Sequence, residues 1–203
     1  MESTGSIFPP VNTLRYGGEM DDKLNKQTWL NAGLQTLAAE GSEGLRIMSI
    51  AQRLGVTKGS FYWHFQNLDE YQSALLEEWE QRHTQQIVHY IEDKGGEALT
   101  KLRNLMMVTV SADARLAQAM RAWANINPKV SDALARVDRA RLAYLVGLLV
   151  SIGWPNDQAE TLARWSYCAL IGHFSLQGPP IVTEQIELIL ETLTPKPTKI
   201  RKK

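Results

Sequence analysis

The sequence contains a single cysteine, Cys168, in 203 residues, so it forms no disulfide within the chain and no zinc site built from cysteines. It lacks any apolar run near the roughly 18 residues of a membrane-spanning helix, and its N-terminus lacks the charged and apolar regions of a signal peptide. It also lacks net charge, with 22 basic and 22 acidic residues. We therefore expect a cytoplasmic protein without a membrane partner, in which any nucleic-acid binding depends on a local patch.

Strand patterns longer than a few residues are absent, and so are internal repeats. Apolar residues instead recur with helical spacing, and glycines and prolines separate the helical segments. The contents of 44% apolar and 22% charged residues are typical of a globular protein. The sequence therefore predicts an all-α fold of about nine helices. We expect a disordered extension over 1–20, a three-helix domain over 21–66, a larger helical domain over 67–195 and a basic tail over 196–203.

The expected helix boundaries follow from capping residues. Asp21 and Asp22 offer an N-cap for a first helix that ends near residue 40, before two glycines. Asn67 offers an N-cap for a long fourth helix, with Glu70 completing a capping box. This fourth helix is expected to reach about residue 93, and the last two helices are expected over 156–176 and 183–194.

The most informative stretch is residues 50–67, which read IAQRLGVTKGSFYWHFQN. Its first part continues an apolar helix face, and Gly55 supplies the left-handed residue that ends that helix. Thr57 then stands at the N-cap position of a second short helix, on which Phe61 and Phe65 are one turn apart. Two short helices joined by a glycine turn predict a helix-turn-helix.

Burying Phe61 and Phe65 would direct their neighbours away from the core. The outward face is then short, polar, aromatic and weakly cationic, as expected for a surface that enters the DNA major groove. The alternative is that the aromatic residues form a buried cluster, but the two phenylalanines already fill that role. The outward face consists of Gly59, Ser60, Tyr62 and Trp63, with Lys58 and His64 at its flanks.

The order of a capped helix, a glycine break, this helix-turn-helix and a long fourth helix resembles the TetR family of bacterial transcriptional regulators. The resemblance is specific over about residues 30–76, and beyond them only the helical architecture matches. It implies an N-terminal DNA-binding domain followed by an effector-binding and dimerisation domain. It also implies a double-stranded DNA operator and a small-molecule effector as partners, and it implies no cofactor.

The resemblance assigns roles to individual residues. Thr57, Lys58, Gly59 and Ser60 match the start of the family's recognition helix, which approaches bases and phosphates. Tyr62 and His64 match residues that hydrogen-bond phosphates, and Trp63 is expected to contact a thymine methyl group or a sugar. Arg46 replaces a frequent helix-capping residue, which suggests a further phosphate contact. The DNA-binding candidates are therefore Arg46, Thr57, Lys58, Gly59, Ser60, Tyr62, Trp63 and His64.

The net charge of the N-terminal part, residues 21–82, limits its expected DNA affinity; we call this part the head. Residues 21–82 contain 6 lysines and arginines against 9 aspartates and glutamates. Because each neutralised phosphate adds to the salt dependence, we expect weak non-specific binding.

The C-terminal part is rich in methionine and aromatic residues, which suit a hydrophobic or aromatic effector but also suit ordinary helix packing. No cationic cluster indicates an anionic effector, although Arg103, Arg115 and Arg121 remain possible contacts for one. The candidate effector residues are Met106, Met107, Met120, Trp123, Tyr144, Trp165 and His173.

Homodimerisation is suggested by small residues on the penultimate helix and an apolar stripe on the last one. The resemblance implies that these helices pair with their copies in a four-helix bundle. The candidate interface residues are Ala159, Ala163, Ala169, Gly172, Ile186, Ile189, Leu190 and Leu193.

Together these features predict a ligand-responsive transcriptional regulator, by default a repressor, that binds a near-palindromic operator as a dimer. A constitutive DNA-binding protein without an effector, and a ligand-binding or scaffold protein whose head does not read DNA, remain alternatives. An enzyme is not expected, because no catalytic constellation is present. Cys168 and His173 are expected on different helix faces, and the spacing of His83 and His89 does not suit a metal.

Overall fold

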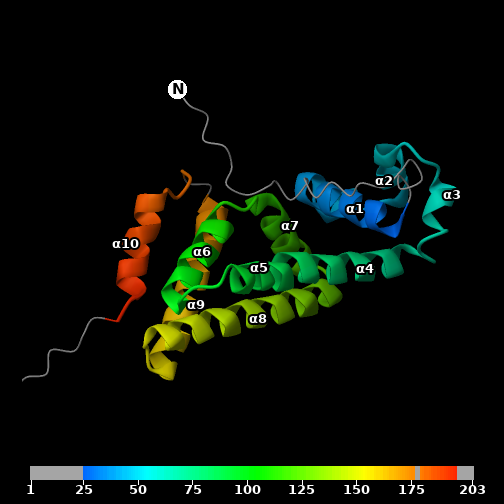
Figure 1. The fold of residues 1–203 in the computed structure, drawn as a ribbon. Helices are drawn as coiled ribbons and strands as arrows, with labels where there is room; N and C mark the ends of the chain where they lie inside the picture. Colours follow the sequence, from blue (N-terminus) through cyan, green and yellow to red (C-terminus); the bar gives the residue numbers. More distant parts are fainter. Residues whose placement is uncertain (1–24, 177–178, 196–203) are drawn as a thin grey trace, which may run out of the picture.

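The computed structural model describes residues 25–176 and 179–195, and within them every regular element is helical. Figure 1 shows α1 to α3 at one end of the molecule and α10 at the other, with α4, α5 and α8 running between them. The predicted all-α fold is therefore confirmed. The helices are α1 Lys26–Glu40, α2 Ile47–Leu54, α3 Lys58–Phe61, α4 Leu68–Glu80, α5 Gln86–Lys94, α6 Ala98–Val110, α7 Ala114–Ala124, α8 Pro128–Ile152, α9 Asn156–Leu176 and α10 Thr183–Leu193.

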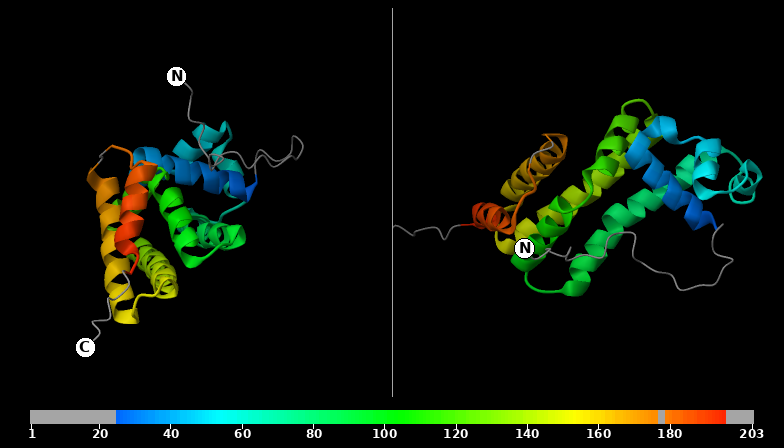
Figure 2. Two further views of the ribbon diagram at one scale, coloured as in Figure 1. Left: turned by 60° about the vertical axis from the view of Figure 1, so that its left-hand side comes forward. Right: turned by 90° about the horizontal axis from the view of Figure 1, so that it is seen from above.

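A π turn, Gln81–Gln85, joins α4 directly to α5. The two helices and the turn form the long fourth helix that the sequence predicts, so the described residues contain nine helical rods. Figure 2 shows the fold from two further directions, and its right-hand view, from above, shows that the molecule is elongated. None of the helices in the described ranges is both long enough and apolar enough to span a bilayer.

Helix ends are fixed largely by the residues expected to fix them. Asn67 caps α4 by accepting a hydrogen bond from the Glu70 backbone N–H at 2.9 Å. The capping box differs in one detail, because the Glu70 carboxylate accepts from the Gln66 N–H, 2.7 Å away, and not from that of Asn67. The first helix begins later than predicted, at Lys26 with Asn25 as its N-cap. The expected caps Asp21 and Asp22, the extension 1–20 and the tail 196–203 lie outside the described residues.

Aromatic side chains from four segments hold α1, α3 and α4 together. Phe61 is fully buried, and its ring centroid lies 5.4 Å from that of Trp29, 5.2 Å from that of Phe65 and 5.5 Å from that of Tyr71. The Tyr71 hydroxyl donates to the Trp29 carbonyl oxygen at 2.7 Å. Edge-on ring contacts and a satisfied buried hydroxyl favour one arrangement of these helices over others.

Two apolar clusters fill the interior, and we call them the proximal and the distal core. The proximal core contains residues of α1, α2, α3 and α4, which pack against α7 and the first half of α8. Met120 and Trp123 contribute from α7, and Val137 contributes from α8. The distal core joins α6, the second half of α8, the start of α9, and α10. Helix α8 is therefore the element shared by both cores.

The π turn begins just after Trp79, the last residue of α4 in the proximal core. Half-buried His83 belongs to this turn, and burial together with the charges of Arg141 and Arg82 lowers the pKa of His83 to about 4. Its imidazole is therefore neutral near pH 7. The Thr84 hydroxyl is buried with no hydrogen-bond partner among the described residues.

A substitution at Gly33 tests the close packing of α1 against α4. A methyl group there would collide with the Tyr71 hydroxyl and lie 2.9 Å from Leu75 Cδ1. We predict that Gly33→Ala lowers the free energy of unfolding by about 1–3 kcal/mol, as measured by urea denaturation. The matched control is Gly147→Ala, at an exposed position in the C-terminal part of α8, where no atom is within 4 Å of an added methyl group. This change should raise stability by about 0.5–1 kcal/mol, and equal effects of the two changes would contradict the packing.

Candidate functional site

Helices α2 and α3 form the predicted helix-turn-helix. Gly55 ends α2 in the left-handed conformation with φ 69°, and the Val56 N–H donates to the Ala51 carbonyl oxygen at 3.0 Å. The chain then turns into α3, and Phe61 and Phe65 both point into the proximal core. The predicted anchoring of the motif by these two phenylalanines is confirmed.

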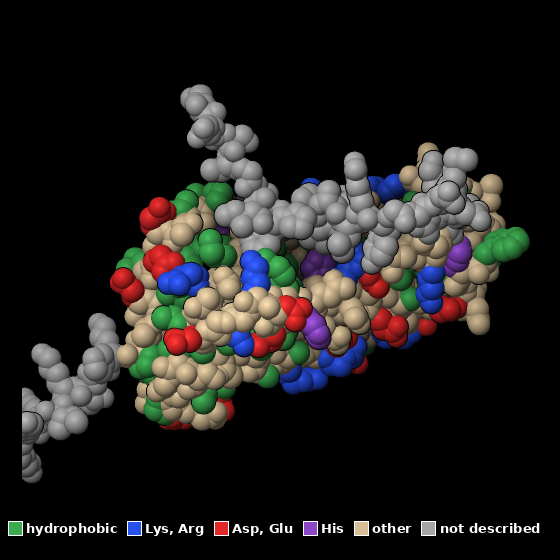
Figure 3. Space-filling view, viewed as in Figure 1, with side chains coloured by type: hydrophobic (Ala, Val, Ile, Leu, Met, Phe, Trp, Pro, Cys, Tyr) green, Lys and Arg blue, Asp and Glu red, His purple; other side chains and the backbone are tan. Residues whose placement is uncertain are grey.

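The residues between the anchors are exposed on the outer end of the molecule. Tyr62 is 51% exposed and Trp63 is 88% exposed, whereas Phe61 is 0% exposed. Lys58 is exposed beside them, and its ammonium lies 5.9 Å from the centre of the Tyr62 ring. Figure 3 shows an apolar side chain that projects at the α3 end. A protruding indole next to a cation and a hydroxyl is suited to contact a groove and its backbone.

The remaining DNA-binding candidates also lie on accessible surface. Thr57 and Gly59 are exposed, and Ser60 and His64 are partly exposed. Arg46 is at the N-cap position of α2, and its guanidinium lies 3.6 Å from the Glu43 carboxylate. The structure thus brings all eight candidates to one end of the fold.

The second helix of the motif is shorter than expected. Helix α3 has 4 residues and ends at Phe61, and Tyr62 to His64 continue as turns. Thr57 occupies the N-cap position, but its side chain accepts no capping hydrogen bond. A single turn has little macrodipole, so a phosphate at this end would depend on individual N–H groups and side chains.

Cations from α8 offset part of the acidic excess of the head. Lys129 pairs with Asp69, and Arg136 pairs with Glu80 at 3.1 Å. Within the head, Arg53 pairs with Glu40. A count of charges over residues 21–82 could not find the α8 partners, because they are about 60 residues away in sequence.

The predicted effector residues do not line one cavity. Met120 and Trp123 are buried in the proximal core, and Trp165 is 73% exposed on α9. Packing thus places these three residues in different environments, and their assignment to one ligand site stays a prediction. Met106, Met107 and Tyr144 are partly buried at the edge of the distal core, and His173 is half-buried on α9.

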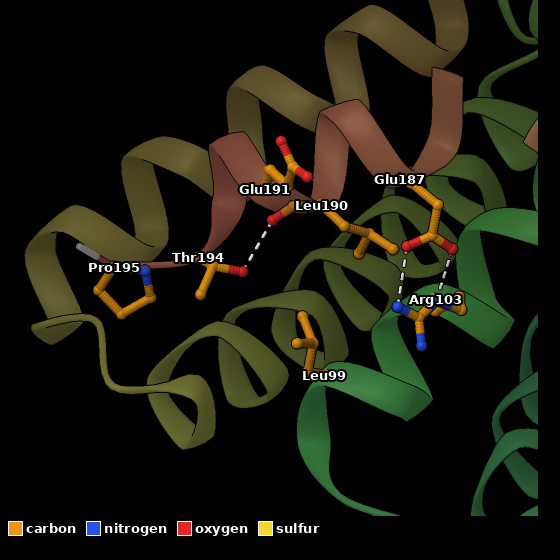
Figure 4. A pocket seen from close by; sticks show the side chains of 7 residues that line it. All are labelled: Leu99, Arg103, Glu187, Leu190, Glu191, Thr194 and Pro195. Carbon is orange, nitrogen blue, oxygen red and sulfur yellow. Dashed lines mark hydrogen bonds and ion pairs between the residues drawn. The ribbon is translucent and has the colours of Figure 1, made fainter. Parts of the chain in front are cut away.

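Two surface grooves border the distal core. One, of about 310 Å³, lies between α6 and α10, and Figure 4 shows the Arg103–Glu187 ion pair across it, with an Nε–Oε1 distance of 2.7 Å. The other, of about 440 Å³, lies beside Tyr144, whose hydroxyl donates to Glu92 at 2.7 Å. Of the seven effector candidates, Tyr144 alone lines one of these grooves.

The predicted dimer residues divide into buried and accessible groups. Five pack within the chain's own distal core and cannot contact a second copy, so their assignment to the interface is wrong; they are Ala159, Ala163, Ile186, Leu190 and Leu193. The apolar stripe on α10 packs against α6, a contact that periodicity alone does not show. Ala169, Gly172 and Ile189 remain accessible.

A different apolar stripe is exposed on the same two helices. On α9 it runs along one face, because its positions are three or four residues apart, through Trp165, Cys168, Ala169, Gly172 and Leu176. On α10 it includes Leu188, which is 64% exposed, and Ile189, which is 36% exposed. We call these residues the α9–α10 stripe.

A polar cluster between the helices was not predicted from the sequence. The Arg121 guanidinium from α7 binds Asp138 on α8, with N–O distances of 2.9 and 3.2 Å. Tyr167 from α9 donates to Asp138 at 2.7 Å and accepts from Arg141 at 3.2 Å. One signal was present in the sequence, since Arg141 stands midway between Val137 and Leu145, both of which are buried.

The helix-turn-helix matches a known family model. Residues 30–70 match the model described as bacterial regulatory proteins, tetR family. The tetracycline repressor protein class G of Vibrio anguillarum is 40% identical over 75 residues, which are 35% of this chain and 34% of that protein. The class A tetracycline repressor protein from transposon 1721 of Escherichia coli is 40% identical over 60 residues, 28% of each chain. The matches thus span about a third of the length of these relatives.

Solved structures match nearly the whole fold. SCO4454, a TetR-family transcriptional regulator from Streptomyces coelicolor, aligns with a TM-score of 0.70 at 19% identity, over 86% of this chain and 89% of that one. The regulator FadR from Bacillus subtilis, in complex with stearoyl-CoA, aligns with a TM-score of 0.62 at 16% identity, over 84% of this chain and 98% of that one. The helix-turn-helix region thus matches the tetR family of bacterial regulatory proteins, and the rest of the chain shares its fold with solved TetR-family regulators.

Proposed function

We propose that this protein is a transcriptional regulator that binds a DNA operator as a homodimer and releases it when a small effector binds. The observation that supports DNA binding best is the contrast between buried Phe61 and exposed Tyr62 and Trp63. The family of the N-terminal region supports the same function. Repression by occupying a promoter is the simplest mode of action, and we propose no catalytic activity.

On DNA, the exposed turn would enter the major groove. The flat indole of Trp63 has no bidentate hydrogen-bonding edge, so it would contact a thymine methyl group or a sugar. Lys58, Tyr62 and His64 would donate to phosphates and orient the head. Arg46 would add a phosphate contact at the start of α2, at the expense of its exposed pair with Glu43.

The α9–α10 stripe is the surface we propose for pairing with a second copy. Its apolar side chains are unusual on an exposed face, and Ala169 and Gly172 would let two helices approach closely. Pairing through a two-fold axis would bring the helix-turn-helix motifs of two subunits to one duplex. Heads about 34–36 Å apart fit successive major grooves, so the operator would be a near-palindrome.

The effector would bind among α6, α7 and α9. Every residue from Arg103 to Val110 in α6 is only partly buried, although eight consecutive residues cover all faces of a helix. The apolar residues Ile171 and Phe174 of α9 are likewise half-buried. Loosely packed apolar helices can separate to admit a hydrophobic ligand, and binding would favour one of two positions of the heads.

Replacement of Trp63 tests the proposed DNA contact. A duplex selected from a random pool by the parent protein should bind Trp63→Ala at least tenfold more weakly, because an 88% exposed side chain has little other role. The melting temperature should not change. The control is Ile126→Ala, which removes another large exposed side chain, at the end of α7, and should leave the affinity unchanged. Equal affinities of parent and Trp63→Ala would contradict the assignment.

A charge in the α9–α10 stripe tests the proposed dimer. We predict that Trp165→Glu converts the dimer to a monomer in sedimentation velocity, because a carboxylate would be buried without a partner. The chain itself should stay folded, because Trp165 is 73% exposed. Ile126→Glu, at a similarly exposed position outside the stripe, should remain dimeric. A Trp165→Glu protein that sediments as the parent does would exclude this stripe as the interface.

A further inference from the structure

Arg141 occupies a position on α8 where an apolar side chain would be expected. It lies one turn from Val137 and one turn from Leu145, which are buried in the proximal and distal cores respectively. Its guanidinium donates to the Tyr167 hydroxyl at 3.2 Å and to the His83 carbonyl oxygen at 2.9 Å. Its central carbon also lies 5.9 Å from the centre of the Trp79 ring. The charge is thus held at a partly buried position between α4, α8 and α9.

Arg141 is distinguished by the lack of a carboxylate partner. Five lysines and arginines of the described residues are partly buried, and four of them form ion pairs; the paired ones are Arg82, Lys101, Arg103 and Arg121. Arg141 has no ion pair within the described part of the chain. A partly buried cation without a counter-charge is costly, so its position favours an anion that binds there.

Neighbouring groups do not supply this counter-charge. Asp138 is the carboxylate of the cluster, and it already accepts both guanidinium nitrogens of Arg121 and the Tyr167 hydroxyl. His83 is not an anion and offers only its carbonyl oxygen. An arginine has five N–H donors, and two hydrogen bonds leave several available. These donors form the planar fork that matches a carboxylate.

A second polar group near the cluster has unused hydrogen-bonding capacity. The Thr84 hydroxyl, next in sequence to His83, is buried and has no partner among the described residues. Arg121 and Tyr167 come from α7 and α9, which also carry the half-buried apolar residues Leu116, Ile171 and Phe174. A ligand that reached this point would therefore meet donors at one end and apolar side chains along its length.

We propose that Arg141 anchors the acidic group of the effector, which is a small carboxylic acid with an apolar body. The proposal rests on the proposed function as an effector-responsive regulator and specifies the chemistry of its ligand. Arg121 is occupied by Asp138, so Arg141 provides the uncompensated charge. Tyr167 positions the Arg141 guanidinium, because its hydroxyl accepts from one guanidinium nitrogen.

Anion binding at Arg141 would affect the long helix that leads to the helix-turn-helix. The π turn is a less regular segment of the long helix, and Arg141 donates to its His83 carbonyl oxygen. A carboxylate that took two N–H groups of the fork would include Nη2, the nitrogen that donates to this carbonyl, and would draw the guanidinium away from it. Loss of the hydrogen bond would free the π turn to rearrange, and α4 leads from this turn directly to the helix-turn-helix.

Matched acids and amides test the proposal. Octanoate with octanamide, and phenylacetate with phenylacetamide, differ in charge but hardly in apolar body, and their binding to the full chain is measured by calorimetry. We expect at least one acid to bind tenfold or more tightly than its amide. Arg141→Gln should abolish this preference, and Arg141→Lys should keep part of it. The matched control is Arg139→Gln, an exposed arginine on the same helix, which should retain the full preference.

The outcomes separate this proposal from the proposed function. Equal binding of acids and amides, no binding of either, or an acid preference that survives Arg141→Gln would overturn the role of Arg141. Thermal denaturation of each variant shows whether it is folded, and Arg141→Lys provides the comparison if Arg141→Gln is not. Operator affinity of the ligand-free parent is measured separately. A parent that binds a selected duplex but fails the acid test refutes this inference alone, whereas a parent that binds no duplex refutes the proposed function.

Discussion

The burial of Phe61 against Trp29, Phe65 and Tyr71 is the interaction on which the rest of the structure depends. It fixes α3 to α1 and α4, and it forces the residues between the two phenylalanines to face outward. The side chains assigned to DNA contact therefore acquire their exposure from the core, and not from the very short α3 helix. Because Tyr71 also belongs to α4, the same contacts connect the exposed turn after Phe61 to the long helix.

The packing of the two cores would connect the proposed effector site to this surface. The proximal core includes Met120 and Trp123 from α7 together with the first half of α8, so the three N-terminal helices are packed against the C-terminal helices. A polar cluster that contains Arg121, Arg141 and Tyr167 joins α7, α8 and α9 near the π turn. A ligand that repositions these helices would move α1 and α4 with them, provided that it binds the two arrangements with different affinities.

Local patterns predicted the local structure, and long-range packing limited the rest. Gly55, Asn67 and the two phenylalanines have roles that a few neighbouring residues determine, and the structure confirms each role. The stripe of α10 was visible from its spacing, but the spacing does not say whether α6 or a second copy covers it. The ion pair between Lys129 and Asp69 joins residues far apart in sequence, as does the cluster around Arg141.

The central claim is that the turn after Phe61 is the surface that meets DNA. Oxidative footprinting of the tryptophans, in the free protein and on a duplex selected from a random pool, tests it most directly. Trp63 is 88% exposed and Trp29 is 0% exposed, so Trp63 should be oxidised rapidly in the free protein and Trp29 should not. The account predicts that the duplex protects Trp63 strongly and leaves Trp29 unreactive. An equal oxidation rate of Trp63 with and without the duplex would contradict it.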